Sequence, residues 1–460
     1  MKILPALLAL LPAFAYSSGF RLDSAGLDAV AGVSVELPPG AVRSGPARQG
    51  ADWTIMIYMN GKSNIEPYAL ADMNRFETVG STEKVNIVVE LGRSRGLEND
   101  TAADGDWTGV RRYLVRKDDD KERITSPVLA ELGASDMGDW REAAKFLRWA
   151  REAYPAKRYM FIIWDHGWGW IDPVKPGDNL AGGGSSKSIS HDFETGNYIK
   201  TTEMGKILKE AGRVDLYASM ACFMQMGEVA YELKGLADVI VGSEEVIMLP
   251  SFNFEDFLGA MISDTGAGAE KAGTYLVDTY HEMYSRPENA EMLAQYKFGA
   301  QLSAIRGSAL RGFADRAGRW AKAVIRNGDD GALRSARRDV LRFEVGDEVT
   351  DPDKLISFYA DIHHFISLYN AALDRTRPGA PAAAAAGREL QDWIDRKLVI
   401  RNASLGSDRT GKSFSAARGV SLHIPGLKGE LLPYYPSYGD LAFEKATAWS
   451  SFVKYMENLE

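Results

Sequence analysis

Cysteine is almost absent from this chain, because Cys222 is the only one among its 460 residues. A single thiol excludes an intramolecular disulfide, which is how exported proteins usually employ cysteine. In an exported chain, an unpaired thiol indicates pairing with another molecule or a reactive role. The alternative is a small buried hydrophobic side chain, which is a common state of free cysteine.

Long hydrophobic runs are scarce as well. No stretch beyond the N-terminus offers about 18 uninterrupted apolar residues, so we expect a mature protein that does not span a membrane. Residues 1–15 combine one positive charge at Lys2, a short apolar core and the ending Ala13-x-Ala15. This composition predicts a secretory signal peptide cleaved near Tyr16, and therefore a secreted or periplasmic protein.

An excess of positive charge is also lacking. The formal net charge is −9 and the two signs are interspersed, which argues against nucleic acid as the main partner. The hydrophobic content of 45% permits a substantial core in one large or two ordinary domains. We predict a leader or propeptide and linker at 16–51, a catalytic core at 52–265 and a helical extension at 266–460.

Apolar runs of strand type alternate with amphipathic stretches of helix type over the core. This alternation predicts an α/β fold in which helices cover both faces of a mostly parallel sheet. The expected strands are 53–59, 85–91, 111–115 at an edge, 159–165, 214–222 and 237–242, and the expected helices are 65–79, 139–154, one starting at Thr201, and 223–233.

Beyond about Pro250 the pattern changes to longer amphipathic helices. We expect three of them, at 266–285, 308–327 and 354–374, followed by an Ala/Pro-rich break at 377–386. One late apolar run at 419–425 has strand character, and we expect it to rejoin the central sheet.

Two of the predicted strands end in residues with reactive side chains. One ends in Asp165-His166-Gly167 and the other in Ala221-Cys222. If the strands are parallel neighbours, their carboxyl ends place an imidazole beside a thiol at the sheet edge where α/β proteins bind ligands. A single cysteine with a distant histidine is a recognised nucleophile signature.

The chemistry of such a pair needs an activated thiol and a place for negative charge on oxygen. A helix starting beside Cys222 would favour the thiolate, and His166 would act as base and later as acid. The N–H groups of Gly167 and Cys222 would form an oxyanion hole. The alternative for His166 is a core histidine at a strand end.

Three other patterns are weaker signals. The stretch 182–188 resembles a phosphate-binding loop but lacks its glycine spacing, so we expect a flexible loop. Asp118-Asp119-Asp120 is a candidate Ca²⁺ site, with a solvated turn as the alternative. His363 and His364 are adjacent, so on a helix they point in different directions and chelate poorly.

The motifs around His166 and Cys222 resemble those of the clostripain family, in the clan of cysteine peptidases that also contains caspases, gingipains and legumain. The resemblance covers roughly 52–460, and the stretches that carry it are 53–59, 137–139, 164–170, 221–233, 242–245, 419–425 and 446–453. It implies a caspase-like three-layer sandwich with a helical C-terminal extension. It also implies a secreted endopeptidase that works through a thioester, with His166 as base and Cys222 as nucleophile. The rival hypothesis is a non-catalytic secreted binding protein that retains the fold.

The family pattern has an aspartate two residues before the cysteine, where it helps to hold a basic substrate side chain. This chain has Met220 there, preceded by Ser219, so the resemblance does not carry a basic preference over. Glu244 and Glu245 follow the next strand and are candidate replacements in the substrate-binding pocket. Their alternative role is that of solvated or cap-forming carboxylates.

The resemblance further implies protein or peptide substrates, no required cofactor and Ca²⁺ as an optional ion. In the family, a cut in the loop between the two strands often accompanies activation. Lys187-Ser188 is the best basic site in the loop 168–197, since Lys175 is followed by Pro176. Because a pocket around Met220 does not favour Lys187, we expect either an activating partner protease or an active intact chain.

Overall fold

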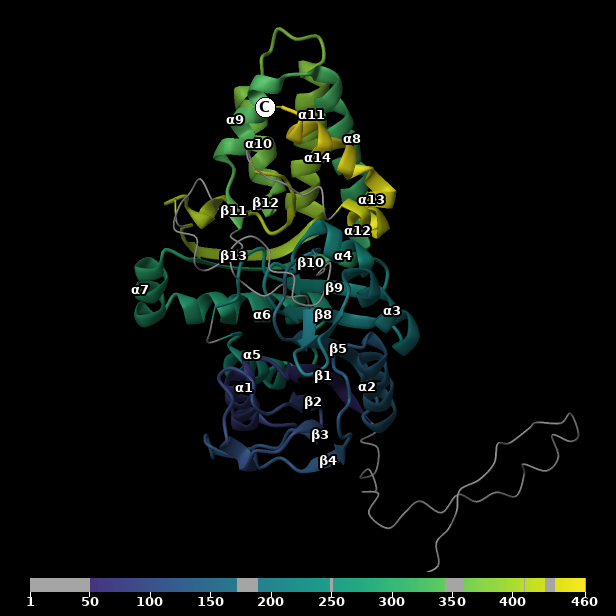
Figure 1. The fold of residues 1–460 in the computed structure, drawn as a ribbon, viewed down its shortest axis with the longest axis vertical. Helices are drawn as coiled ribbons and strands as arrows, with labels where there is room; N and C mark the ends of the chain where they lie inside the picture. Colours follow the sequence, from purple (N-terminus) through teal and green to yellow (C-terminus); the bar gives the residue numbers. More distant parts are fainter. Residues whose placement is uncertain are drawn as a thin grey trace, which may run out of the picture. The chain divides into compact units, whose positions relative to one another are not determined.

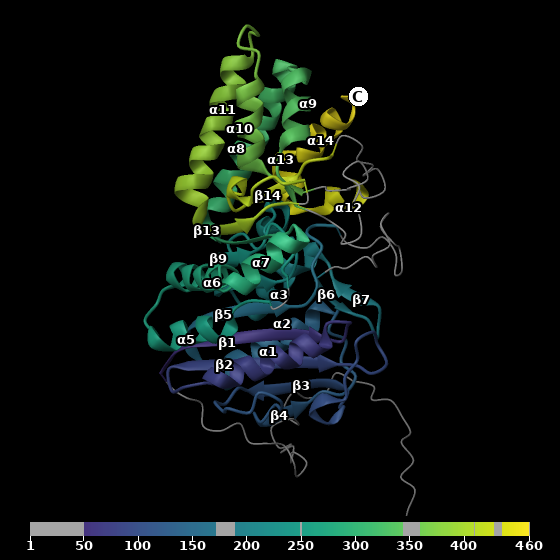
Figure 2. The same ribbon diagram turned by 90° about the vertical axis from the view of Figure 1, so that its left-hand side faces the viewer.

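The computed structural model describes residues 50–171, 189–248, 251–343, 359–408, 410–426 and 435–459. A nine-stranded sheet in the order β13-β10-β9-β8-β5-β1-β2-β3-β4 runs through them (Figures 1 and 2). Its five central strands are parallel: β9 (Ala237–Gly242), β8 (Val214–Met220), β5 (Ala156–Trp164), β1 (Ala51–Gly61) and β2 (Val85–Arg93). The α/β prediction and the five predicted parallel strands are confirmed.

Antiparallel strands extend the sheet at both ends. They are β3 (Gly109–Leu114) and β4 (Val128–Glu131) at one end, and β10 (Gly299–Arg306) and β13 (Val399–Gly406) at the other. The edge position expected for 111–115 is wrong, because β4 pairs with β3 and takes the edge. β4 was not predicted, since a four-residue strand carries almost no periodic signal.

The sheet forms the middle of three layers. Alternate residues of β1 enter two different cores, Met56 and Tyr58 one of them and Ile55 and Ile57 the other, as the period of two in a strand requires. One core includes α2 (Trp140–Ala153), α3 (Thr201–Ala211) and α4 (Gly227–Glu232). The other includes α1 (Glu66–Val79), α5 (Phe254–Ser263) and α6 (Ala269–Tyr284).

The C-terminal helices gather beyond the β13 end of the sheet (Figures 1 and 2). Trp320 lies at the centre of their core, where its ring meets Phe365, Tyr369, Trp449 and Phe452. The helices are α8 (Leu310–Asn327), α9 (Asp330–Asp339), α10 (Ile362–Ala372), α11 (Ala380–Trp393), α12 (Tyr435–Asp440), α13 (Ala442–Thr447) and α14 (Trp449–Glu457), while α7 (Pro287–Tyr296) follows α6.

Two predictions for the C-terminal part are wrong. The late strand does not rejoin the central sheet: β14 (Ser421–His423) pairs with β12 (Tyr359–Asp361), which pairs with β11 (Arg342–Phe343). The strands of the predicted extension that do join the sheet are β10 and β13, which the sequence did not predict. The Ala/Pro-rich segment is the beginning of α11, because proline is tolerated in the first helical turn and the alanines favour helix.

No helix among the described residues is long and apolar enough to cross a membrane. The predicted signal peptide and nearly all of the predicted leader, 16–51, lie outside the described residues, which begin at Gly50.

Candidate functional site

The strands that carry His166 and Cys222 are parallel neighbours, as predicted. β5 pairs with β8 in a register that sets Trp164 opposite Met220. The N–H of Asp165 donates to the carbonyl of Met220 at 3.3 Å, which continues the ladder one step beyond the strands. His166 and Cys222 each stand two residues past the last pair, so both emerge at the carboxyl edge of the sheet.

Gly167 lies directly against the backbone of Cys222. A Cβ atom at Gly167 would stand 2.5 Å from the carbonyl oxygen and 2.9 Å from the amide nitrogen of Cys222, and 2.8 Å from the Cβ of Ala221. Real Cβ atoms are not found at such distances, so only glycine lets the two segments approach. The backbones of the two residues predicted to form an oxyanion hole are therefore adjacent.

The His166 ring contacts two residues, Asn64 and Phe193, that were not predicted from the sequence. Its Nε2 lies 2.7 Å from Oδ1 of Asn64, and the Phe193 ring stacks on it at 6.1 Å between centroids and 14° between planes. Asn64 follows β1, the strand on the other side of β5. The sequence does show that Asn60-Gly61 ends a predicted strand, 53–59, so polar residues were expected to follow it. It does not show which of these polar residues turns towards His166.

The residue before the histidine is fixed by the same loop. Asp165 is buried and accepts hydrogen bonds from Asn60 Nδ2 at 3.3 Å and Ser63 Oγ at 3.5 Å, and from the N–H of His191. The end of β1 and the segment after it therefore hold Asp165 through Asn60 and Ser63, and His166 through Asn64.

Cys222 does not stand at a helix start, so that part of the sequence prediction is wrong. Phe223 adopts a left-handed conformation with φ of 62°, and its N–H donates to the carbonyl of Glu245 at 3.2 Å. The N–H of Gln225 donates to Ser243, and α4 begins only at Gly227. The segment after Cys222 thus pairs with the segment after β9 and does not form a helix.

One side of the Cys222 loop is filled by aromatic rings. Phe223 packs between Trp168 and Tyr359, with centroid distances of 6.1 and 5.4 Å. The hydroxyl of Tyr359 donates to the carbonyl of Trp168 at 2.5 Å. This contact ties the motif after His166 to β12 of the C-terminal part.

The four predicted substrate-binding residues are all buried, with exposures of 1% for Ser219, 3% for Met220, 0% for Glu244 and 2% for Glu245. The Ser219 hydroxyl donates to Tyr217 at 2.8 Å, whereas Met220 belongs to the core on the opposite face. Oε1 of Glu245 accepts from the N–H of Val246. Their roles towards a substrate remain predictions.

Glu244 is engaged with the C-terminal part. Its Oε2 accepts from the N–H of Gly419 at 2.9 Å, and its side chain meets that of Asp361. Burial raises the pKa of Asp361 to about 6, while burial and the neighbouring charge of Asp361 raise the pKa of Glu244. The two carboxyl groups therefore hold a proton between them, with Glu244 as the donor.

Asp118–Asp120 has the hydrogen bonds of a turn, and the His363-His364 rings point in different directions. Oδ1 of Asp118 accepts from the N–H of Asp120 and Oδ1 of Asp120 from two following N–H groups, as in a turn. His363 faces Asp395 while His364 accepts from the N–H of Leu341, so the two rings diverge. Within the ranges that the structure describes, no group of three or more His, Cys, Asp and Glu side chains is arranged to hold a metal ion. The stretch 182–188, with Lys187-Ser188, lies outside the described residues.

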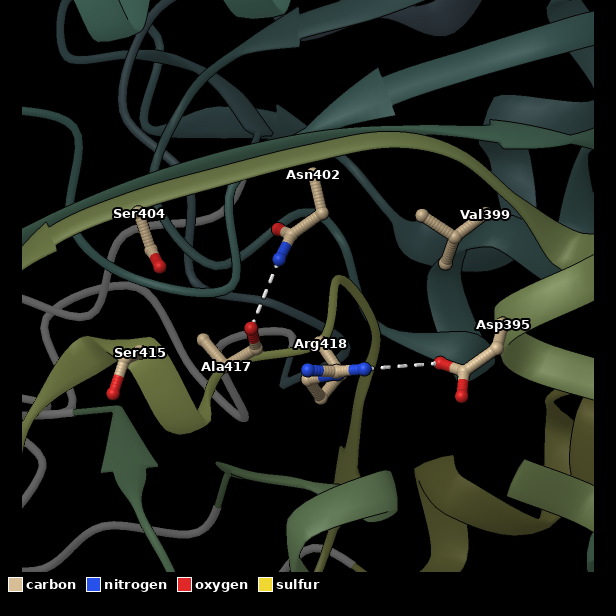
Figure 3. Close-up of a pocket in the computed structure, with 7 residues that line it drawn as sticks. All are labelled: Asp395, Val399, Asn402, Ser404, Ser415, Ala417 and Arg418. Carbon is tan, nitrogen blue, oxygen red and sulfur yellow. Dashed lines mark hydrogen bonds and ion pairs between the residues drawn. The ribbon is translucent and has the colours of Figure 1, made fainter. Parts of the chain in front are cut away.

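A polar hollow of 410 Å³ lies between β13 and the segment 415–418 (Figure 3). Asn402 donates to the carbonyl of Ala417 at 2.9 Å across it, and Arg418 pairs with Asp395 at its far end. None of the predicted site residues lines this hollow.

The fold and site define a class: a three-layer α/β protein whose thiol and imidazole stand at the carboxyl ends of adjacent parallel strands. Residues 57–456 match the clostripain family, and the chain belongs to that family. Clostripain of Hathewaya histolytica is 25% identical over 229 residues, which cover 47% of this chain and 43% of the relative. The chain thus matches less than half the length of this curated relative.

Two solved structures have the same fold. A secreted C11 cysteine protease from Bacteroides thetaiotaomicron, in complex with an irreversible peptide inhibitor, is 19% identical with a TM-score of 0.59, covering 87% of this chain and 99% of that one. An inactive zymogen C11 protease from Parabacteroides distasonis is 16% identical with a TM-score of 0.57, covering 86% and 98%. These likenesses confirm the predicted fold class.

Proposed function

We propose that this chain is a secreted cysteine endopeptidase that hydrolyses peptide bonds through Cys222 and His166. The observation that carries the proposal is the adjacency of β5 and β8, which places both residues at one sheet edge with Gly167 against Cys222. Membership of the clostripain family supports the same activity. Residues 1–15 direct export and are removed.

The reaction uses only this chain's groups, a peptide and water. His166 takes the thiol proton, and the Cys222 thiolate attacks the carbonyl carbon of the scissile bond. The negative charge on the oxygen is stabilised by the N–H groups of Gly167 and Cys222. The imidazolium then protonates the leaving amine, which departs and leaves a thioester. His166 next deprotonates a water molecule that attacks the thioester, releasing the carboxylic acid and restoring the thiol.

No cofactor is required by this chemistry, and Ca²⁺ is at most an accessory ion. The substrates are proteins or peptides. An activating protease that cuts within 168–197 is the expected partner, and incubation of wild type beside Cys222→Ala separates self-processing from cleavage by another enzyme.

The test compares wild type, Cys222→Ala and His166→Ala on a library of quenched fluorescent peptides. We expect each variant to keep its circular dichroism spectrum and to lose about a thousandfold or more in kcat/KM, because the two residues act as a unit. Iodoacetamide should label Cys222 rapidly near neutral pH. Wild type without hydrolysis and with a slowly labelled thiol would instead favour the non-catalytic binding protein.

A further inference from the structure

The polar hollow beside β13 is a cavity that the proposed reaction does not use. Its volume of 410 Å³ lies between β13, the segment 415–418 and the helical turn Ile394–Leu398 that precedes β13 (Figure 3). Ligand sites in proteins have volumes of roughly 300–1,000 Å³ and are mostly apolar. This hollow is lined mainly by charged and uncharged polar side chains, those of Asp395, Arg418, Asn402, Ser404 and Ser415. It is therefore suited to a small polar ligand.

One charge of each sign faces the hollow, and the two charges are only loosely paired. Nη2 of Arg418 lies 3.5 Å from Oδ1 of Asp395, and the two side chains are 47% and 41% exposed (Figure 3). Charge-assisted hydrogen bonds are about 2.7–2.9 Å long, so both groups are able to bind a closer partner. His363 lies 3.4 Å from Oδ2 of Asp395, but burial lowers the pKa of His363 and leaves the ring mostly uncharged near pH 7. Asp395 can therefore bind an ammonium, and Arg418 a carboxylate.

The closeness of these two charges favours an α-amino acid. Such a molecule carries its ammonium and its carboxylate on one carbon atom, so its charges are as near to each other as those of Asp395 and Arg418. A guanidinium binds a carboxylate through two parallel hydrogen bonds, and a carboxylate accepts from an ammonium. A peptide has its terminal charges at opposite ends of the chain and is poorly matched to this pair.

The uncharged side chains of the hollow can bind a polar group of the ligand. Asn402 donates one amide hydrogen to the carbonyl of Ala417 at 2.9 Å, and an amide has a second hydrogen to donate. The Ser404 hydroxyl donates to a backbone carbonyl at 2.8 Å, so its oxygen can still accept. The Ser415 hydroxyl accepts from Ser413 at 2.9 Å, so its hydrogen can still be donated. Together they offer the donors and acceptors that an amide or hydroxyl group requires.

We infer that the hollow is a binding site for a free α-amino acid with an uncharged polar side chain. The carboxylate of the ligand binds Arg418, its ammonium binds Asp395, and its side chain lies along Asn402, Ser404 and Ser415. The loose ion pair is thus replaced by two closer ones. The hollow stays neutral, because its own two charges and those of the ligand each sum to zero.

Hydrogen bonds connect two walls of the hollow to the segment after β9. On one wall, the N–H of Gly419, the residue after Arg418, donates to Oε2 of Glu244 at 2.9 Å. On the other wall, Oδ1 of Asn402 accepts from Nε2 of Gln301 at 2.8 Å. Oε1 of Gln301 in turn accepts from the N–H of Glu244 at 2.7 Å. Both routes therefore end at Glu244.

The segment after β9 supports the nucleophile. The carbonyl of Glu245 accepts from the N–H of Phe223, the residue after Cys222, at 3.2 Å. A ligand that holds Arg418 and Asn402 in place therefore also holds the backbone that pairs with the Cys222 loop. We expect occupancy of the hollow to order this loop and to raise kcat/KM, a coupling that rests on the proposed function.

Isothermal titration calorimetry on wild type tests the site, with L-glutamine as the probe. L-glutamine amide lacks the carboxylate, N-acetyl-L-glutamine lacks the ammonium, and glycyl-L-glutamine has its charges further apart. Each should bind about five- to tenfold more weakly than L-glutamine, because each loses a charge-assisted contact with a half-exposed group. In a separate assay with a quenched fluorescent peptide, saturating L-glutamine should raise kcat/KM about fivefold.

Two variants assign the contacts. Arg418→Gln should weaken binding of L-glutamine to the level of L-glutamine amide without weakening the amide further, and Asp395→Asn should act likewise with N-acetyl-L-glutamine. Both should fold, because the side chains are half exposed and Arg418 contacts the buried Asp361 through its backbone N–H. Arg401→Gln is the matched control. Arg401 also lies on β13, is 46% exposed and pairs with Asp278 at 2.6 Å, but it does not line the hollow.

The site is refuted if L-glutamine binds no more tightly than its blocked forms, if glycyl-L-glutamine binds as tightly, or if Arg418→Gln and Asp395→Asn bind it as Arg401→Gln does. Binding that leaves kcat/KM unchanged would refute the coupling to Cys222. A wild type without peptidase activity would refute the proposed function itself, and the calorimetric comparison would still decide whether the hollow binds an amino acid.

Discussion

The contact between Asn64 and His166 determines which ring nitrogen can act as the base. An amide oxygen only accepts, so Nε2 of His166 carries a hydrogen and donates it to Asn64 Oδ1 at 2.7 Å. In the neutral ring, the lone pair is then on Nδ1, and in the proposed reaction it is this nitrogen that takes the thiol proton. The stacked Phe193 ring favours the same orientation by packing against one face of the imidazole.

Substitutions of Asn64 test this role of a positioning residue. Asn64→Ala should reduce kcat about 10- to 100-fold with little change in KM, because the base loses its orientation rather than the substrate its contacts. Asn64→Asp should shift the limb of the kcat/KM–pH profile that reports the imidazole to higher pH, since a carboxylate stabilises the imidazolium. An unshifted profile in Asn64→Asp would contradict direct contact with His166.

Among single residues, the sequence predicted those whose chemistry is unusual and missed those whose role depends on placement. Cys222 and His166 end apolar runs, so both their type and their location were visible. Asn64 and Phe193 are ordinary residue types in loops. Their roles arise from contacts with His166, which is 102 residues from Asn64 and 27 from Phe193, and no local pattern reports such contacts.

At the scale of elements, the hairpin formed by β6 (Ile189–Asp192) and β7 (Asn197–Ile199) carries Phe193 to the histidine. Lys62 holds the hairpin: its fully buried ammonium pairs with Asp192 at 3.2 Å and Glu194 at 2.8 Å, and its carbonyl accepts from the N–H of Phe193. The loop after β1 thus positions His166 directly through Asn64 and indirectly through this hairpin.

Removal of the Lys62 charge should therefore affect both stability and activity. Lys62→Met leaves the buried Asp192 carboxylate without its cation, a type of change that costs about 3–5 kcal/mol. At temperatures where the variant remains folded, kcat/KM should still fall, and the effects of Lys62→Met and Phe193→Ala should not add, because both act through the hairpin. Additive effects would contradict that coupling.

Lys145→Met provides the control for this cycle. Lys145 pairs with Glu142 on α2, and its side chain is 56% exposed. Removal of such a surface pair changes the free energy of unfolding by about 1 kcal/mol or less, and kcat/KM should not change.

Elements were predictable from sequence where a periodic pattern was long and uninterrupted. The parallel strands and α2, α6 and α8 were expected at nearly their observed positions. The pattern failed where tertiary pairing overrides local preference, as at Phe223, whose N–H pairs with Glu245 where a helix was expected. It also failed for β10 and β13, whose place at the end of the sheet depends on partners far away in sequence.

At the scale of the whole molecule, the buried pair of Glu244 and Asp361 joins the catalytic sheet to the C-terminal part. Glu244 follows β9, one residue from the contact with Phe223, whereas Asp361 ends β12 and caps α10. Asp361 also accepts from the N–H of Arg418, whose charge lowers the Asp361 pKa, while Glu245 adds a negative charge near Glu244. Loss of the proton on Glu244 would leave two neighbouring buried negative charges at this joint.

The pH dependence of stability follows from the sign of these shifts. Both carboxyl groups have pKa values raised by burial, that of Asp361 to about 6, so the folded state binds protons more tightly than the unfolded state. The stabilisation is fully present below the unfolded pKa, near 4. The part due to Asp361 is lost as pH rises through about 6, and the part due to Glu244 is lost as pH rises through the raised pKa of Glu244.

Glu244→Gln should remove the part of this loss that is due to Glu244, because an amide can donate to Asp361 at any pH. We expect urea unfolding of wild type and Glu244→Gln to give similar free energies at pH 5. At pH 8 the variant should be more stable, by about 1.4 kcal/mol for each unit by which folding raises the pKa of Glu244 up to that pH. Glu83→Gln, which removes a charge at an exposed loop position, should show no such divergence. A Glu244→Gln protein that is less stable than wild type at pH 8 would show that the joint is held by an ionised Glu244 instead of a shared proton.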